Sequence, residues 1–524
     1  MSTAQKSIFV STAIPYVNAP PHLGFVLEVL LADVFARHAR SRGADVCFAS
    51  GTDDNSLKNV RAAEAAGLPA RAFVDSNAAH YRALAPQIHA SFDAFVSTST
   101  DPRHALAVRA LWEACARAGD LEKRTYRGLY CLGCEAFYEP ADLANGVCPE
   151  HGVAPEIVDE DNWFFKLSRY QAPIAEALAS GRLHIHPPER AREIERFVAT
   201  GLHDVSVSRP RARARGWGIE VPGDPGQVVY VWLDALAYYL TAVGHPEDPV
   251  SYRRFWADAA RRVQVVGKGI ARFHAVLWPA LLLAAGLPLP TDLWVHGYLT
   301  VNGQKIGKSA GNGVDPAAVI ARYGVDALRY FLLRYVGPTQ DADIDDERLA
   351  RVYTSDLADA LGNLVARTLT LVRRNGDCWN GEGIDPSGEA LTARARALEG
   401  TVDACVARLA PDDALRAIWA VVAAANKHIS DTAPWAVAKA RDAASVPAEV
   451  GRHAAQLRAI LHHAVVAIDA IGRALTPFLP STAAAIASAL ANPAAAPPIL
   501  FPKRGTVPDR PGSVPDRSLD ANAR

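Results

Sequence analysis

Two short segments carry side chains that suit phosphate groups. The first, PHLG (21–24), lies between an apolar β-branched stretch (7–14) and an amphipathic stretch that runs to residue 43. Glycine lets a phosphate approach the backbone, and a histidine at a helix N-terminus can donate to an oxygen on which charge builds. The second, KIGKS (305–309), has two lysines that can hold a polyphosphate and release it when the loop moves. The pair predicts polyphosphate chemistry, although either segment alone is more often a structural turn or a solvated loop.

A third cluster has the residue types and spacing of a zinc site. Cys131 and Cys134 form one pair, and Cys148 and His151 form a second pair shortly after it. Three thiolates and one imidazole suit tetrahedral Zn²⁺, and nearby glycines and a proline favour the tight turns of zinc knuckles. The alternative is three buried cysteines and a surface histidine. A site closed by four protein ligands is structural, so we assign this zinc no catalytic part.

The bulk composition narrows the class of protein. The chain has 524 residues, 50% hydrophobic and 21% charged, which predicts several folded domains with large cores. A net charge of −1 gives no general attraction to nucleic acid, so any such contact needs local patches. Seven scattered cysteines do not indicate a disulfide framework. Neither a signal-peptide pattern nor an unbroken apolar run of about 18 residues is present, so we expect a cytoplasmic protein without a membrane segment.

The order of apolar patterns predicts an α/β fold. Strand, glycine-bearing turn, long helix and second strand follow one another over residues 7–54, which is the βαβ unit of a doubly wound parallel sheet. Residues 123–170 interrupt this alternation, and from about residue 355 the pattern is helical throughout. The predicted segments are 1–118 and 226–300 for the two halves of the sheet domain, 119–225 for an insertion, 301–355 for a linker domain, 356–490 for a helical domain and 491–524 for a loose tail.

The HxG turn after the first strand, combined with a KxxKS loop after the last, resembles the two-part signature of class I aminoacyl-tRNA synthetases. Over roughly residues 7–480 the chain resembles the methionyl-tRNA synthetase family. The matching stretches include AIPYVNAPPHLG, GTDD, YCLGCEAFY, YVWLDA, FHAVLWPALL, WVHGYLTVNGQKIGKS and ANKHISDTAPW. The resemblance implies a Rossmann-type parallel sheet, an inserted zinc-knuckle domain and an all-α anticodon-binding-type domain.

The resemblance also implies an amino-acid pocket. Asp53 matches the carboxylate that holds the substrate ammonium, and aromatic walls suit a flexible thioether such as methionine. We expect Tyr16 or His274 to supply a polar group near the sulfur. Without the family match, Trp232 and Tyr239 would be ordinary core residues. The implied pocket residues are Ile14, Tyr16, Asp53, Trp232, Ala235, Leu236, Tyr239, Ile270 and His274.

For ATP, bound with Mg²⁺, the resemblance implies contacts at both conserved segments. It places His22, Gly24, Lys305 and Lys308 on the phosphates, Glu28 on the ribose, and His296 and Val301 where the adenine-binding strand ends. It gives catalytic roles to His22, Lys305, Lys308 and Arg209, and a tRNA-binding role to Asn426.

The chain departs from the family pattern inside this site. Phe25 replaces the second histidine of the first motif, Asn55 falls in the Asp-Glu-His-Gly stretch, Gly269 replaces the Asp of a Gly-Lys-Asp motif, and Gly307 replaces a serine. Phe25 and Gly269 each remove an expected polar contact to ATP, and one lost transition-state donor can cost about 3 kcal/mol. Two such losses predict a slow enzyme unless nearby groups compensate.

A further departure concerns the anticodon. The family has a tryptophan just after its last helices, whereas the last tryptophan here is Trp435. This predicts weakened anticodon reading. The basic stretch 209–216 is either an acceptor-stem contact or a solvated face.

Three functions are consistent with these residues. The first is a monomeric methionyl-tRNA synthetase that charges tRNA through methionyl-adenylate. The second is a paralogue that activates an amino acid for a small-molecule acceptor, as hydrazine-forming ligases do. The third is a non-catalytic tRNA-binding or regulatory protein, which the retained His22, Asp53, Lys305 and Lys308 argue against.

Overall fold

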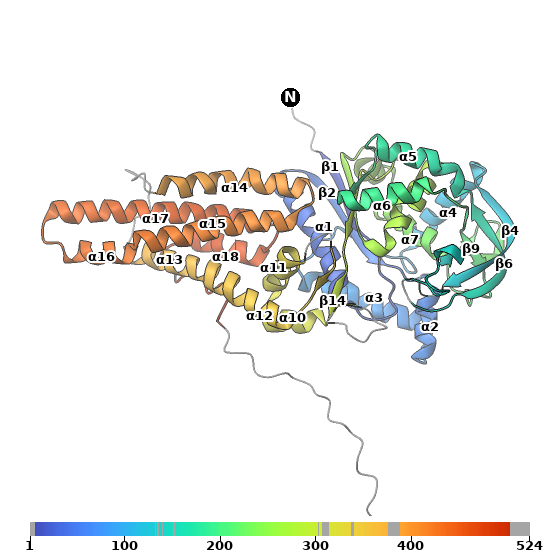
Figure 1. The fold of residues 1–524 in the computed structure, drawn as a ribbon, viewed down its shortest axis with the longest axis horizontal. Helices are drawn as coiled ribbons and strands as arrows, with labels where there is room; N and C mark the ends of the chain where they lie inside the picture. Colours follow the sequence, from blue (N-terminus) through green and yellow to red (C-terminus); the bar gives the residue numbers. More distant parts are fainter. Residues whose placement is uncertain are drawn as a thin grey trace, which may run out of the picture.

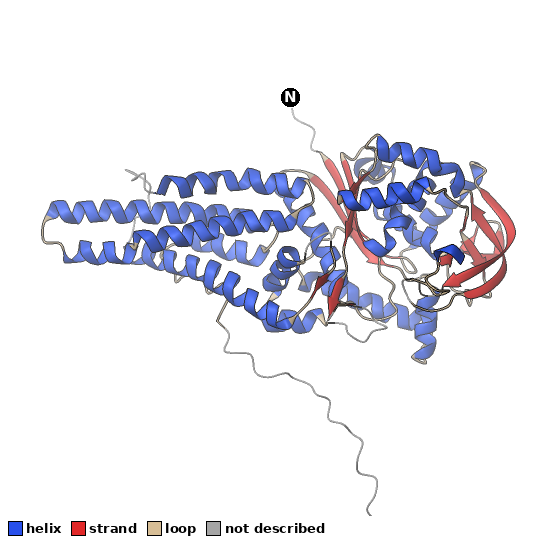
Figure 2. Cartoon of the chain, in the orientation of Figure 1, coloured by secondary structure: helices blue, strands red, loops and turns tan. Residues whose placement is uncertain are grey.

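The computed structural model describes residues 6–131, 133, 136–138, 140–149, 152–301, 303–306, 314–336, 340–375 and 388–503. Figure 1 shows an elongated molecule with a lobe of mixed helices and strands and a long lobe of helices. Figure 2 shows the strands gathered in the first lobe, in one central sheet and in smaller sheets around it. The predicted combination of an α/β part and a helical C-terminal part is confirmed.

The central sheet has six parallel strands in the order β3-β2-β1-β12-β13-β7. Helices cover both of its faces, with α1 on one face and α7 and α9 packed within the core on the other. Strands buried on both faces read as continuous apolar runs, which is why they show no polar alternation in the sequence. The strands are β1 (Ser7–Thr12), β2 (Asp45–Thr52), β3 (Ala94–Ser97), β12 (Arg261–Gly267), β13 (Asp292–His296) and β7 (His184–His186), and the helices of this lobe are α1 (Leu23–Ser41), α2 (Leu57–Ala65), α3 (Ala70–Gln87), α4 (Pro102–Arg117), α7 (Val231–Ala242), α8 (Pro249–Tyr252) and α9 (Trp278–Ala284).

The strand order reverses beside β1. From β1 the chain builds outward through β2 and β3, and it later returns to the other side of β1 to build β12 and β13. Such a switch point leaves a crevice at the carboxyl ends of the two central strands, where ligands of doubly wound sheets bind. The turn after β1 and the loops after β12 and β13 therefore border the expected site.

The segment between the two halves of the sheet forms an antiparallel sheet of its own. Its four strands run in the order β5-β4-β6-β8, at the end of the molecule away from the helical lobe (Figure 1). The same segment also supplies β7, which adds the outermost strand to the main sheet. Its elements are β4 (Leu121–Cys131), β5 (Ala136–Tyr138), β6 (Glu156–Phe165), β8 (Val205–Ser206), α5 (Gln171–Ala179) and α6 (Pro188–Ala199), followed by a small sheet of β9 (Ser208–Pro210), β10 (Glu220–Val221) and β11 (Asp224–Val229).

A linker with a three-stranded sheet leads from the lobe of mixed helices and strands to the helical lobe. Its elements are β14 (Leu299–Val301), β15 (Gln304–Lys305), α10 (Pro316–Tyr323), α11 (Val325–Tyr335), β16 (Ala342–Asp343) and α12 (Asp346–Val352). The helical lobe follows with α13 (Asn363–Asn375), α14 (Glu389–Ala407), α15 (Pro411–Thr432), α16 (Pro434–Ala443), α17 (Pro447–Leu475) and α18 (Pro480–Ala491).

One buried arginine joins the two lobes. The guanidinium of Arg329, in α11, donates to the carboxylate of Asp33 in α1 at 2.8 Å and to the carbonyl oxygens of Ile88, Pro477 and Phe478. Neither Arg329 nor Asp33 is exposed to solvent. Although burial opposes ionisation, the neighbouring Arg329 and Arg37 and the contact with Ser91 lower the pKa of Asp33, so the carboxylate stays charged. The helix that begins at the HxG turn is thereby tied to the end of the helical lobe.

Among the described residues, α17 alone has the length and hydropathy of a membrane-crossing helix. Its most apolar window is 61% buried inside the protein, against α14, α15, α16 and α18. The core helix of a helical bundle can have the same length and hydropathy, and the burial of α17 fits that role.

Candidate active site

The HxG turn is built around the ring of His22. His22 is the N-cap of α1, and its Nδ1 accepts from the backbone N–H of Gly24 at 3.0 Å. A Cβ on Gly24 would lie 2.8 Å from the His22 ring, so a larger residue here would displace that ring. Because Nδ1 accepts, Nε2 carries the proton of the neutral ring. The turn thus presents an N–H donor beside a helix N-terminus, as the predicted phosphate contact needs.

Glu28 and His296 meet across the switch point. Oε1 of Glu28 accepts from the backbone N–H of Ala13 at 2.7 Å, and its Oε2 lies 2.9 Å from Nε2 of His296. Nδ1 of His296 lies 2.8 Å from the carbonyl oxygen of Gly297. Since Ala13 follows β1 and His296 ends β13, this pair brings together two of the predicted ATP-binding residues at the carboxyl edge of the sheet.

The predicted amino-acid pocket lies at the same edge. Trp232 in α7 stacks on Phe273, with ring centroids 3.7 Å apart and planes within 6°. His274 meets both Trp232 and Tyr239 edge-on, at 6.4 Å and 5.8 Å between centroids. The pocket residues Ala235 and Leu236 are also buried in α7, and Ile270 is half-buried in the loop after β12. Phe273 was not predicted, although it stands next to His274 in the FHAVLW stretch.

Burial keeps the side chains of His274 and Tyr239 neutral. Nδ1 of His274 donates to the carbonyl oxygen of Ile270 at 2.9 Å, and burial lowers the pKa of His274 to about 4. Burial also raises the pKa of Tyr239 well above its ordinary value. The Tyr239 hydroxyl is buried and has no hydrogen-bond partner among the described residues. Tyr239 therefore joins Tyr16 and His274 as a group that can face a substrate heteroatom.

Asp53 lies directly after β2, beside Tyr16. The two residues form an isolated parallel bridge, and the N–H of Asp53 donates to the carbonyl oxygen of Pro15 at 2.9 Å. The side chain of Asn59 donates to the backbone carbonyl oxygens of Asp53 and Asp54. Asp53 is almost fully buried, so its carboxylate can orient a cationic group in a site of low polarity.

Asn55 has a structural contact that the sequence did not reveal. Its amide donates to Oδ2 of Asp234 in α7 at 2.9 Å. Oδ1 of Asp234 lies 2.6 Å from Nε2 of His104, whose Nδ1 lies 2.9 Å from the hydroxyl of Thr241. All members but Asn55 are fully buried. This network fixes α7, and with it Trp232 and Tyr239, against α4.

Arg209 lies between two aromatic rings. Its guanidinium is 4.4 Å from the ring centroid of Tyr130 and 4.9 Å from that of Tyr230, and it donates to the Tyr130 hydroxyl. The other basic residues of the 209–216 stretch face glutamates, as Arg211 pairs with Glu220, Arg213 with Glu160 and Arg215 with Glu64. This pairing fits a solvated face better than a nucleic-acid contact.

Parts of the predicted site lie outside the described residues. Lys308 and Gly307 are among them, as are the predicted zinc ligands Cys134 and His151. The backbone of Lys305 pairs with Thr300 in the linker sheet, and Val301 lies in the same sheet. Cys131 and Cys148 are buried, and Sγ of Cys148 lies 3.6 Å from the Tyr138 hydroxyl. Within the described ranges, no three metal-binding side chains come together.

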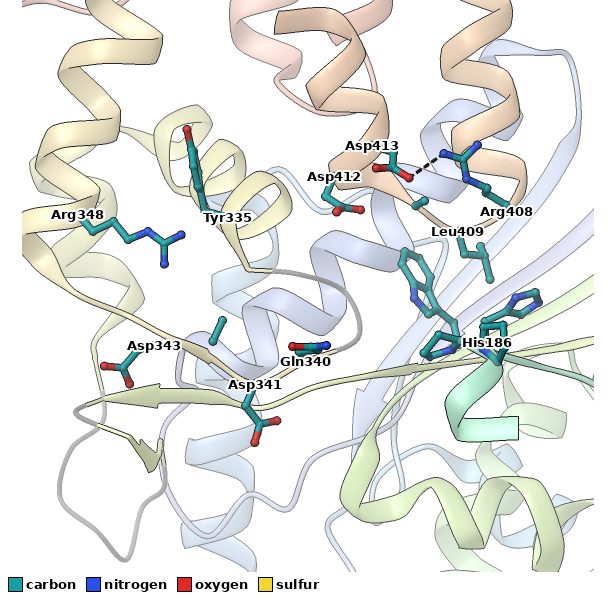
Figure 3. Close-up of a pocket in the computed structure, with 15 residues that line it drawn as sticks. His186, Tyr335, Gln340, Asp341, Asp343, Arg348, Arg408, Leu409, Asp412 and Asp413 are labelled. Carbon is teal, nitrogen blue, oxygen red and sulfur yellow. Dashed lines mark hydrogen bonds and ion pairs between the residues drawn. The ribbon is translucent and has the colours of Figure 1, made fainter. Parts of the chain in front are cut away.

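A cavity of about 630 Å³ lies between β7, the loop before β16 and the α14–α15 corner (Figure 3). Its charged residues are largely paired within the protein. Arg408 contacts Asp413 at 2.7 Å, and Asp341 contacts Lys268 at 2.7 Å. None of the predicted site residues lines it.

The helical lobe presents one exposed aromatic platform. Trp435, at the start of α16, is 47% exposed, and the guanidinium of Arg367 lies 5.2 Å from its ring centroid. The amide of Asn426 donates to the carbonyl oxygens of Ala360 and Val422, so both of its N–H groups are engaged inside the lobe. The sequence interpretation treated Trp435 as misplaced, because a tryptophan was expected after the last helices.

A parallel sheet with its switch point at β1, an HxG turn there and a cluster of buried aromatic side chains at the same edge are the features of a class I aminoacyl-tRNA synthetase. The family model of class I (M) tRNA synthetases matches residues 8–151 and 131–369, and the anticodon-binding domain of methionyl-tRNA ligase matches residues 380–499. The chain therefore belongs to the methionyl-tRNA synthetase family.

Individual relatives agree over nearly the whole chain. The methionine–tRNA ligase of Brucella suis is 38% identical over 502 residues, which is 94% of this chain and 93% of the relative. The structure of Mycobacterium tuberculosis methionyl-tRNA synthetase with methionyl-adenylate has a TM-score of 0.86 at 36% identity and covers 92% of this chain and 93% of its own. The free form of that enzyme has a TM-score of 0.79 at 33% identity, with 93% and 92% coverage.

Proposed function

We propose that the chain activates methionine with ATP and transfers the methionyl group to tRNA(Met). The observation that carries this proposal is the meeting, at one sheet edge, of the His22 donor, the Glu28–His296 pair and an aromatic pocket bordered by Asp53. The likeness to a relative solved with methionyl-adenylate supports formation of that intermediate.

In the first step, Asp53 holds the ammonium of methionine while the aromatic walls enclose its side chain. A carboxylate oxygen of methionine attacks the α-phosphorus of ATP, and the bond to pyrophosphate breaks. Nε2 of His22 donates to the phosphate as negative charge builds there. Glu28 holds the ribose, His296 and Val301 border the adenine, and Lys305 and Lys308 hold the departing pyrophosphate. ATP would bring Mg²⁺ with it, and the ion would offset part of the negative charge of the phosphates. Arg209, close to Tyr230 at the start of α7, supplies positive charge near the site.

In the second step, a ribose hydroxyl at the 3′ end of tRNA attacks the methionyl carbonyl and AMP leaves. We assign anticodon stacking to Trp435, because an exposed ring next to a guanidinium suits a splayed base. Asn426 can contribute only its amide oxygen, since its N–H groups are already engaged. The matched anticodon-binding domain supports tRNA, rather than a small molecule, as the acceptor.

We further propose a structural zinc ion held by Cys131, Cys134, Cys148 and His151. Its chemical basis is three thiols and an imidazole at knuckle spacing. The turn after Cys148 has the backbone of a knuckle, with Gly152 N–H donating to the Cys148 carbonyl and Cys148 N–H donating to that of Val153. Zinc would tie the turn after β4 to this second turn and takes no part in the reaction. We also propose that the protein acts as a cytoplasmic monomer.

Pyrophosphate exchange with each amino acid tests activation. We expect exchange that depends on methionine, and its absence with every amino acid would reject activation. His22→Asn is the matched variant, because asparagine still caps α1 but does not place a donor where Nε2 lies. We expect it to melt like the wild type and to lose roughly a hundredfold in exchange rate.

Charging of purified initiator tRNA tests the second step. Trp435→Ala should lower charging efficiency by about 1–3 kcal/mol, or roughly fivefold to 150-fold, and leave exchange unchanged. Lys427→Ala, which removes an exposed charge paired with Asp431, is the control from the same lobe. Brisk methionine exchange without any charging would favour a small-molecule acceptor instead.

A further inference from the structure

The segment that follows β2 joins the two parts of the proposed amino-acid site. Asp53, the proposed ligand of the substrate ammonium, lies two residues before Asn55. The amide of Asn55 donates to Oδ2 of Asp234 in α7 at 2.9 Å. Helix α7 also carries Trp232 and Tyr239, two rings of the proposed side-chain pocket. One short segment therefore bears the carboxylate for one end of the substrate and reaches the helix that encloses the other end.

The backbone of this segment is fixed by hydrogen bonds. The N–H of Asp54 donates to the hydroxyl of Thr98 at 2.9 Å. The amide of Asn59 donates to the carbonyl oxygens of Asp53 and Asp54, at 2.9 Å each. The side chain of Asn55 therefore extends from a backbone that is itself held in place, and a donor held in this way can set the position of its acceptor.

The carboxylate of Asp234 is shared between two segments. Asn55 contacts its Oδ2, while its Oδ1 lies 2.6 Å from Nε2 of His104 in α4. Asp234 and His104 have no exposed surface, and Asn55 is half-buried. A buried carboxylate that loses a donor bears a large desolvation cost, so it shifts toward the donors that remain. Because Asp234 is part of α7, loss of the Asn55 amide would move or loosen this helix relative to Asp53.

We propose that Asn55 is a positioning residue that sets the distance between the carboxylate of Asp53 and the rings of α7, and so selects the amino acid by the length of its side chain. In this account the amide touches no substrate atom and acts through Asp234. The chain has asparagine where the family stretch has histidine, so an amide rather than an imidazole makes the contact. This inference rests on the proposed activation of methionine and adds a determinant of selectivity to that site.

Asn55→Ala tests the role in selectivity. Pyrophosphate exchange with methionine and with ethionine, which is one methylene group longer, measures the preference as a ratio of two kcat/KM values. We expect the wild type to prefer methionine roughly tenfold or more, and the variant to lose at least about threefold of that preference. The ratio is independent of the fraction of folded enzyme, so general destabilisation cannot produce this result. A wild type without a preference, or an unchanged ratio in the variant, would overturn the proposal.

The separate KM values give a second readout. In Asn55→Ala the KM for methionine should rise roughly threefold to tenfold, a part of what a hydrogen bond to a charged group contributes, and the KM for ATP should stay the same. Equal rises in both KM values would contradict the proposal. Asn363→Ala, which removes an amide that donates to Asp359 in the helical lobe, is the matched control and should change neither value.

A double-mutant cycle tests whether Asn55 acts through Asp234. Asp234→Ala removes the acceptor, so adding Asn55→Ala should change the preference for methionine over ethionine no further. Effects that multiply would show that Asn55 acts by another route, and would overturn the proposal.

Asn55→Asp gives the same information if Asp234→Ala does not fold. Two carboxyl groups in contact cannot both ionise easily, so the KM for methionine, relative to that of the wild type, should be higher at about pH 8 than at about pH 6. The titratable groups that face Asp234, which are Asp54 and His104, are present in both forms, and their titration cancels from this ratio. A ratio that does not change with pH would contradict the contact.

Equilibrium dialysis with labelled methionine and ethionine separates this inference from the proposed function. If the wild type binds methionine more tightly than ethionine and Asn55→Ala narrows that difference, the inference holds even in the absence of exchange. If exchange is robust and the variant keeps the wild-type preference, the reaction assignment stands and the role of Asn55 fails. A wild type that neither exchanges nor binds methionine would reject both.

Discussion

The amino-acid pocket and the nucleotide end of the active site share one sheet edge but are built in different ways. Packed rings make the pocket, since Trp232 contacts Phe273 and His274, His274 contacts Tyr239, and all but Phe273 are buried. The nucleotide end consists of a backbone turn at His22 and of single polar contacts, such as those of Glu28.

This difference explains where the chain departs from its family. A packed pocket ties each ring to several neighbours, so one change disturbs many contacts. At the nucleotide end the polar contacts are single, so a change at one position, such as Gly269, disturbs fewer neighbours. Phe25 fits the same account, because its ring is buried against Tyr81 at 5.0 Å and the lost polar group is exchanged for packing.

The largest effect is expected at Asp53, where the pocket holds a charge. Asp53→Ala removes the buried carboxylate that we propose holds the methionine ammonium, so the expected cost is about 3–5 kcal/mol, or roughly 150-fold to 5000-fold in kcat/KM for methionine. Pyrophosphate exchange measures it. Asp75→Ala, which removes an exposed carboxylate near Arg71, should change nothing, and a loss confined to the KM for ATP would contradict the assignment.

The buried His274 should make the free energy of unfolding depend on pH. Burial lowers the pKa of His274 to about 4 from its ordinary 6.5, so the native ring stays neutral while the unfolded chain takes up a proton below pH 6.5. The free energy of unfolding therefore falls as the pH drops from about 6.5 to about 4, by up to roughly 3 kcal/mol from this group. Urea unfolding at pH 7 and pH 4.5 should show a smaller fall for His274→Gln than for the wild type. Parallel profiles would mean that the ring is not desolvated.

Glu28 tests the nucleotide end. Glu28→Gln removes the charge that contacts His296 and that we propose holds the ribose, and a hydrogen bond to a charged group is worth about 1.5–3 kcal/mol. We expect kcat/KM for ATP to fall roughly tenfold to 150-fold while the KM for methionine stays nearly constant. An equal rise in both KM values would show that the two ends are one coupled site. Glu64→Gln, at an exposed pair with Arg215, is the control.

The sequence predicted those parts of the molecule that depend on local pattern. The strand 7–14 and the helix ending near residue 43 correspond to β1 and α1, and the helical C-terminal part follows from its apolar spacing. Only the resemblance to the family indicated that residues of α7 line the amino-acid pocket.

Contacts between distant segments were missed, because no local pattern encodes them. Asn55 with Asp234, Tyr298 with Gly269 and Arg367 with Trp435 each join segments far apart in the chain. The strand β7 was missed for the same reason, since a three-residue run inside an insertion carries too little pattern to predict a sheet edge.

The smallest expected effect distinguishes packing from polar recognition within the pocket. Trp232→Phe keeps an aromatic ring opposite Phe273 but reduces the stacked area, and aromatic pairs contribute about 0.5–1.5 kcal/mol beyond burial. The KM for methionine should rise roughly twofold to tenfold, and the KM for ATP should stay the same. Trp112→Phe, at a buried tryptophan that meets Trp163 edge-on outside the pocket, controls for the general cost of the substitution. If the two variants behave alike in both KM values, the Trp232–Phe273 stack is ordinary core packing. If only Trp232→Phe weakens methionine binding, the rings of the pocket act as a recognition surface, and the nucleotide end alone depends on replaceable polar groups.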